Sequence, residues 1–181
     1  MTTFLLSISL FLAASGLAVA WRRSGAPPES ISAMVYDLPA RQRWRWSAWL
    51  WAVLLTGAVP LIEAAAFLGW LTVAVLMTVA ALPLVAGKSN TLHYVLGIVG
   101  GLLSQMCVLR VCCLWLLLWP LTVIALAWIA LSNSYAANRI ASFLDTRAVL
   151  LIEVVAATAL YGALVGVLLG PDMSHRLWMI Y

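Results

Sequence analysis

The sequence predicts an all-α protein, a polytopic bundle of transmembrane helices with about six spans. Hydrophobic residues make up 65% of the 181 residues, charged residues make up only 9%, and the mean hydropathy is +1.06. In soluble domains, charged residues alone account for about a quarter of the chain. An apolar helix crosses a bilayer with about 20 residues, so this chain has room for about six or seven crossings and no separate soluble domain. We therefore expect residues 1–181 to form one integral membrane domain.

The expected spans are the apolar runs between charged residues, prolines and glycines. Residues 46–87 hold almost no charge and are about twice as long as one crossing, which requires a hairpin of two helices. Its turn is expected near residues 64–69, where Gly69 permits a tight reversal. Arg110 alone separates the fourth run from the fifth, and without a turn there the count falls to five. The predicted spans are 3–21, 46–66, 68–87, 92–108, 111–131 and 148–170.

The basic residues predict the orientation in the membrane, because cytoplasmic loops are enriched in Lys and Arg. With the loop after the first span in the cytoplasm, eight of the ten Lys and Arg lie inside, while Arg110 and Arg176 lie outside. We therefore expect both termini on the non-cytoplasmic side of a bacterial inner membrane. The net charge of +4 lies mostly beside apolar runs, so we expect it to orient the chain and predict no nucleic-acid partner.

A polar stretch, ESISAMVYDLPARQRWRW, follows the first span as residues 29–46. Its apolar residues recur at i, i+3, i+4 and i+7, which predicts a short amphipathic helix over 30–38 at the cytoplasmic interface. The arginines that follow at every second position should attract anionic headgroups of membrane lipids, and the tryptophans of residues 44–51 should form an aromatic belt. The apolar stripe is Ile31, Met34, Val35 and Leu38, and the arginines are Arg41, Arg43 and Arg45.

Two carboxylates lie within predicted spans, where a charge costs at least about 2.5 to 3.5 kcal/mol, so each is a candidate site residue. Glu153 lies in a wholly apolar run near the cytoplasmic end of the last span, at the depth of His93. Glu63 lies near the outer end of the second span, at the level of Arg110. All four residues are candidates for binding a proton or a ligand. The alternatives are that Glu63 reaches the headgroups and that His93 is an ordinary residue at a helix start.

Two predicted spans carry glycines four residues apart, a pattern that favours close packing of membrane helices. Gly97 and Gly101 lie in the fourth span, and Gly162 and Gly166 lie in the last one. We expect these two faces to pack against each other, which would bring the histidine of the fourth span close to the carboxylate of the last. The same faces could also serve a homo-oligomer or a hetero-oligomer.

Ser30, Ser32, Asp37 and His93 resemble part of the site of membrane zinc hydrolases of the alkaline ceramidase and adiponectin-receptor superfamily, which use a serine, an aspartate and three histidines. This chain has two histidines, too few for that metal site, and its three cysteines cluster within residues 107–113. The sequence also lacks the common zinc-protease, phosphate-loop and serine-hydrolase motifs. We therefore predict no metal and no cofactor, and we favour a non-catalytic protein while an enzyme stays open.

The favoured function is transport, or the binding of a small ligand or lipid, by a helical bundle with a buried carboxylate. One alternative is a non-catalytic membrane subunit or assembly factor of a larger complex. A second alternative is a membrane-embedded hydrolase that acts on lipid. Under the predicted orientation, Ser32, Tyr36 and Asp37 share the cytoplasmic side with Glu153 and His93, so the mouth of any site should open there.

Overall fold

The computed structural model describes residues 1–24, 28–35, 38–82 and 90–169, and every regular element in these ranges is helical. The prediction of an all-α protein is therefore confirmed. In chain order the elements are α1 (Thr2–Ser24), η1 (Ser32–Val35), η2 (Ala40–Gln42), α2 (Trp44–Ala65), α3 (Phe67–Ala81), α4 (Thr91–Cys112), η3 (Cys113–Leu117), α5 (Leu118–Ser132) and α6 (Ser134–Leu169).

Four helical runs of the described chain are long and apolar enough to cross a membrane, which indicates an integral membrane protein. Each of the six predicted spans overlaps a helix, but helix length does not support six crossings. The helices α3 and α5 have 15 residues each, which extends to about 22 Å, less than the hydrocarbon core of about 30 Å. The four long runs are Thr2–Arg23, Trp44–Ala65, Thr91–Ser132, which joins α4 to α5, and Tyr135–Leu168.

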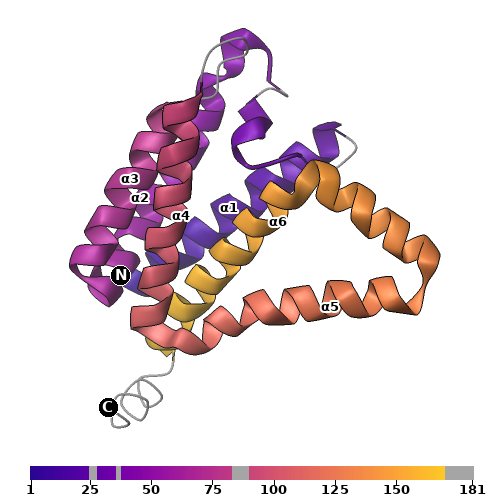
Figure 1. The fold of residues 1–181 in the computed structure, drawn as a ribbon. Coiled ribbons are helices and arrows are strands. Elements are labelled where there is room, and N and C mark those ends of the chain that lie inside the picture. Colours follow the sequence, from indigo (N-terminus) through magenta and orange to yellow (C-terminus); the bar gives the residue numbers. More distant parts are fainter. Residues whose placement is uncertain (25–27, 36–37, 83–89, 170–181) are drawn as a thin grey trace.

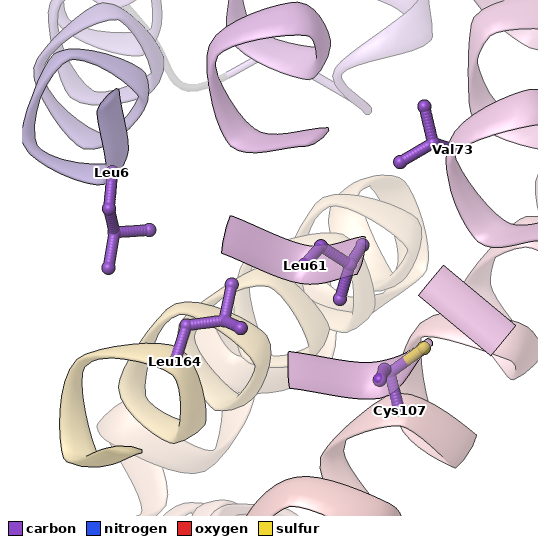
Figure 2. Close-up of a cluster of buried hydrophobic side chains, with 6 residues drawn as sticks. Leu6, Leu61, Val73, Cys107 and Leu164 are labelled. Carbon is purple, nitrogen blue, oxygen red and sulfur yellow. The ribbon is translucent and has the colours of Figure 1, made fainter. Parts of the chain in front are cut away.

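Five helices pack into one body, formed by α1, α2, α3, α4 and the second half of α6 (Figure 1). Each contacts the next along the chain, and α6 contacts both α4 and α1, so the set closes on itself. Side chains from all five helices reach a common apolar centre, where burial stabilises the body. Those labelled in Figure 2 are Leu6, Leu61, Val73, Cys107 and Leu164.

The helix α6 bends at Arg147, whose backbone (φ −134°, ψ 17°) is not helical. In a continuous helix the N–H of Leu150 would bond to the carbonyl of Thr146, but here it donates to the carbonyl of Glu29 at 3.2 Å. The bend therefore starts a new helix N-terminus, and the loop after α1 satisfies one of its N–H groups. Before the bend, α5 and the first half of α6 form an arm that leaves the body and returns to it (Figure 1).

The expected amphipathic helix over 30–38 is not formed in the described part of that segment, where η1 is a 3₁₀ helix of four residues. The carbonyl of Ile31, which an α-helix would pair with the N–H of Val35, accepts the indole N–H of Trp46 instead. The hydroxyl of Ser30 accepts the N–H of Ala33, as an N-cap does, and this bond starts η1. The four residues of the apolar stripe still share one cluster with Trp46, so the segment packs against the bundle.

A single residue, Ala66, joins α2 to α3 within the range where the turn was expected. Its backbone (φ 52°, ψ −125°) lies in the region that side chains other than glycine rarely adopt. Gly69 has a different role from the predicted one, because a Cβ there would lie 2.6 Å from the carbonyl oxygen of Leu61. Gly69 therefore permits the close approach of the two helices, while Ala66 makes the reversal.

Candidate functional site

The loop after α1 is held against three helices, and we call residues 28–35 the clamped loop. The carboxylate of Glu153, in α6, accepts a hydrogen bond from the N–H of Ile31 at 2.5 Å. The indole Nε1 of Trp46, in α2, donates to the carbonyl oxygen of Ile31 at 2.8 Å. Side chains from two different helices thus satisfy both backbone polar groups of one loop residue, which fixes the loop relative to each helix.

His93 supplies the third contact, from α4, and its side chain is buried. Its Nδ1 lies 2.5 Å from the carbonyl oxygen of Leu82, and its Nε2 lies 2.9 Å from the hydroxyl of Ser32. A carbonyl oxygen can only accept, so Nδ1 carries a proton. In the neutral ring Nε2 is then the acceptor, and the Ser32 hydroxyl donates to it. The histidine therefore links the clamped loop to the end of α3.

Contacts within the chain also shape the clamped loop locally. The hydroxyl of Ser30 accepts the N–H of Ala33 at 2.9 Å, a serine turn that leads into η1. Met34 and Val35, at the end of the loop, are buried against α1 and α2. The carbonyl of Glu29 accepts the N–H at the α6 bend described above. The loop is therefore anchored by apolar contacts as well as by hydrogen bonds.

A cavity of about 280 Å³ lies between the second half of α1, the first turns of α2 and the end of the clamped loop. Its walls are mostly apolar, with Trp46 and Trp49 from α2 and Met34 from the loop. Two charged side chains, those of Arg23 and Arg45, also line it, and both residues are exposed. The cavity therefore combines an apolar interior with a cationic margin.

Gly16 allows α1 and α2 to approach closely beside this cavity. A Cβ at residue 16 would lie 2.2 Å from the indole ring of Trp49, so a larger residue would displace that ring. The Nε1 of Trp49 donates to the carbonyl oxygen of Leu12 at 2.8 Å, which ties the indole to α1. The sequence interpretation missed this wall because it assigned the tryptophans of α2 to an aromatic belt. The small pair Ser15 and Gly16 is the signal that could have indicated a close helix contact.

Three of the residues predicted for the cytoplasmic side, Glu153, His93 and Ser32, lie in or beside the clamped loop. Glu153 and His93 bond to adjacent loop residues, so the two side chains are linked through the loop. Ser32, predicted at the mouth of a site, is the residue that His93 holds. The two other residues predicted there, Tyr36 and Asp37, lie outside the described residues.

Glu63 and Arg110 lie at the opposite end of the body, where α2 and α4 end. Glu63 is exposed, and its carboxylate accepts a hydrogen bond from the hydroxyl of Thr2 at 2.7 Å. Arg110 is exposed in the last turn of α4. The structure therefore brings Glu63 together with the start of α1 and separates it from the residues around the clamped loop.

The two glycine faces do not meet as expected. In the described chain nothing lies within 4 Å of a Cβ built at Gly97 or Gly101, so this face of α4 is open. The glycines of α6 are covered instead by an indole, since Cβ atoms at Gly162 and Gly166 would lie 2.4 and 3.6 Å from Trp115 of η3. The helices α4 and α6 do contact each other, through a separate cluster of valine and alanine side chains. The turn after α4 brings Trp115 into the groove that the α6 glycines leave.

Comparison with models of known protein families found no match to this chain, and comparisons with curated proteins and with solved structures found none either. Within the described ranges, no three His, Cys, Asp or Glu side chains are grouped so that they could hold a metal ion. The groups that could act on a ligand are those of the clamped loop and the cavity. Together these offer an apolar space, two arginines and a serine hydroxyl bonded to a histidine.

Proposed function

We propose that this integral membrane protein binds a small amphipathic, lipid-like molecule in the cavity between α1, α2 and the clamped loop. The cavity carries this proposal, because an apolar space with a few convergent polar groups is the usual form of a small-ligand site. In this view Glu153 and His93 are positioning residues. They hold the loop whose Met34 forms part of the cavity wall, and they do not themselves touch the ligand.

Binding fits the contacts of Glu153 better than transport does. A carboxylate that carries a proton or an ion across the membrane has to exchange partners during each cycle. Glu153 instead accepts the backbone N–H of Ile31, a group that needs an acceptor when it is removed from water. Neither Glu153 nor His93 lines the cavity. A fixed structural bond is therefore the better account of the carboxylate.

We also propose, from the distribution of basic residues and not from helix length, that the chain crosses a bacterial inner membrane six times, with both termini on the non-cytoplasmic side. The fifth crossing would be made by the arm, in which α5 and the first half of α6 together return the chain to the level of the clamped loop. This orientation places the cavity and its arginines at the cytoplasmic leaflet, as the excess of basic residues favours. A reporter enzyme that works only outside the cytoplasm should be active when it is fused to the C-terminus. An inactive fusion would contradict the orientation.

The binding proposal is tested by filling the cavity. Ser15 lines it, and its hydroxyl bonds within α1, to the carbonyl of Leu12 at 3.0 Å. Ser15→Phe should therefore place a ring in the cavity at little cost to the helix. Ser7→Phe is the matched control, because Ser7 is exposed on the same helix and its hydroxyl also bonds within it, to Thr3 at 2.9 Å.

The measurement is the binding of a fluorescent lysophospholipid to the purified full chain in a neutral detergent. Wild type and Ser7→Phe should bind the probe with equal affinity, while Ser15→Phe should weaken binding at least about tenfold, a loss of about 1.4 kcal/mol. Equal binding by all three proteins would overturn the proposal. A circular dichroism spectrum for each protein shows whether the helices are retained.

The bond between Ser32 and His93 favours a second candidate function, lipid ester hydrolysis. The hydroxyl donates to Nε2 at 2.9 Å, and the bond from Nδ1 to Leu82 fixes the ring, which is how a histidine activates a serine nucleophile. A fluorophosphonate probe should then label wild type and fail to label Ser32→Ala or His93→Gln. If wild type is not labelled, the serine and histidine serve only to hold the loop.

A further inference from the structure

We infer that the ligand of this cavity is an anionic, phosphate-bearing membrane lipid, with its headgroup between Arg23 and Arg45 and one acyl chain along the tryptophan wall. This inference rests on the proposed function and adds the class of ligand. The polar groups inside the cavity are bonded within the protein, while the two arginines at its margin can bind a ligand.

Among the described residues that line it, the interior of the cavity offers a ligand almost no hydrogen-bond donors. The indole N–H of Trp46 is bonded to the carbonyl of Ile31, and that of Trp49 is bonded to the carbonyl of Leu12. The hydroxyl of Ser15 donates to the same carbonyl of Leu12. The other interior walls are alkyl and thioether groups, such as Val19. Whatever enters the interior must therefore be apolar, as an acyl chain is.

The arginines provide the opposite chemistry at the margin. A guanidinium has five N–H donors, and Arg45 uses one of its terminal nitrogens toward Gln42 at 3.1 Å. Its other neighbour is the ring of Trp44, 5.9 Å from the guanidinium carbon. Neither partner is acidic, so the charge of Arg45 is not neutralised by them. Guanidinium groups bind phosphate oxygens in pairs, which suits a phosphate held between two arginines.

The surrounding sequence adds to this positive field. Residues 22–45 contain five arginines and two acids, a net charge of +3. The cytoplasmic leaflet of a bilayer is negatively charged, so basic residues near it are attracted to its lipids. A phosphate attached to an acyl chain satisfies both parts of the cavity at once, whereas a free phosphate would leave the apolar walls uncovered. The occupant that fits is therefore a lipid of the membrane itself.

The test compares two lipids and two double variants of the full chain in a neutral detergent. Native mass spectrometry would measure the binding of dioleoylphosphatidylglycerol and of dioleoylphosphatidylcholine, which differ in headgroup and share their chains. The test variant is Arg23→Gln with Arg45→Gln. The control variant is Arg22→Gln with Arg41→Gln, which removes the same charge from neighbouring exposed residues that do not line the cavity.

Wild type and the control variant should bind phosphatidylglycerol at least about tenfold more tightly than phosphatidylcholine. The test variant should bind both lipids alike. Equal binding of the two lipids by wild type would overturn this inference, and so would an equal loss of preference in both variants, which would indicate general surface attraction. If Ser15→Phe still weakens lipid binding in either case, the proposed function stands. If no lipid binds and Ser15→Phe changes nothing, the proposed function fails as well.

Discussion

The two ends of the helical body are closed in different ways. At one end the clamped loop is tied to three helices by side-chain hydrogen bonds from Glu153, Trp46 and His93. At the other end α2 turns directly into α3 at Ala66, and Gly69 lies against the backbone of α2. The first closure depends on side-chain hydrogen bonds together with the burial of Met34 and Val35, and the second depends on the shape of the backbone.

This difference indicates where the molecule can adapt to a ligand. A loop held by separate hydrogen bonds can shift while the helices stay folded, because local opening costs less than global unfolding. A helix turn held by direct backbone contact has no such freedom. The cavity lies at the adaptable end, with the clamped loop as one wall.

The largest effect is expected from Glu153→Leu. This change removes the acceptor of the Ile31 N–H. Losing one partner of a hydrogen bond to a charged group should lower the free energy of unfolding by about 3 kcal/mol. Glu153→Gln keeps an amide oxygen as acceptor, so its free energy of unfolding should fall by less than about 1 kcal/mol. Unfolding by titration with a denaturing detergent would measure the free energy of unfolding of each variant.

The matched control is Glu63→Leu, at the opposite end of the body. The carboxylate of Glu63 is exposed, and its partner is the hydroxyl of Thr2. The free energy of unfolding should therefore change by no more than about 0.5 kcal/mol. Glu153→Leu should also weaken binding of the fluorescent lysophospholipid, whereas Glu63→Leu should not. Equal losses in the two leucine variants would show that the ends do not differ in the way described.

The next largest effect is expected at the opposite end, from Gly69→Ala. The added methyl group would lie 2.6 Å from the carbonyl oxygen of Leu61, so two helix backbones must separate. Overpacking of this kind costs about 2 kcal/mol. Gly97→Ala is the control, because a Cβ at that position meets no neighbour among the described residues. The higher helix propensity of alanine should raise the free energy of unfolding by up to about 1 kcal/mol there. A loss in Gly97→Ala as large as in Gly69→Ala would contradict the contact at Leu61.

The sequence could predict the helices and could single out Glu153 as a carboxylate within an apolar run, but it could not predict what Glu153 contacts. Apolar periodicity and length locate helices because these are local properties. The partner of Glu153 is a backbone N–H 122 residues earlier in the chain, which no residue pattern marks. The same limit explains why the expected contact between the two glycine faces was wrong. Trp115 reaches the glycines of α6 because the chain turns at η3, and no residue spacing marks that turn. The spacing of the glycines shows which face of a helix carries small residues, and the tertiary structure decides which side chains cover that face.

A smaller effect is expected from Ser32→Ala, which removes one of the bonds that hold the clamped loop. The bond to His93 should contribute about 1 kcal/mol, and its loss should speed amide hydrogen exchange in residues 28–35. Exchange at the opposite turn, residues 62–70, should stay unchanged. Faster exchange at both ends would show that the variant loosens the whole body and that the loop is not held separately.

The smallest effect is expected from Ala66→Gly, which should stabilise the protein. Ala66 adopts a backbone conformation that costs a non-glycine residue about 1 kcal/mol or more, while glycine adds entropy to the unfolded chain worth about 0.5 to 1 kcal/mol. The net gain should be about 0.5 kcal/mol, measured by the same detergent titration. Lipid binding should not change, because this turn lies at the end opposite the cavity. A loss of stability would show that the turn is not strained, and that packing around Gly69 alone closes this end.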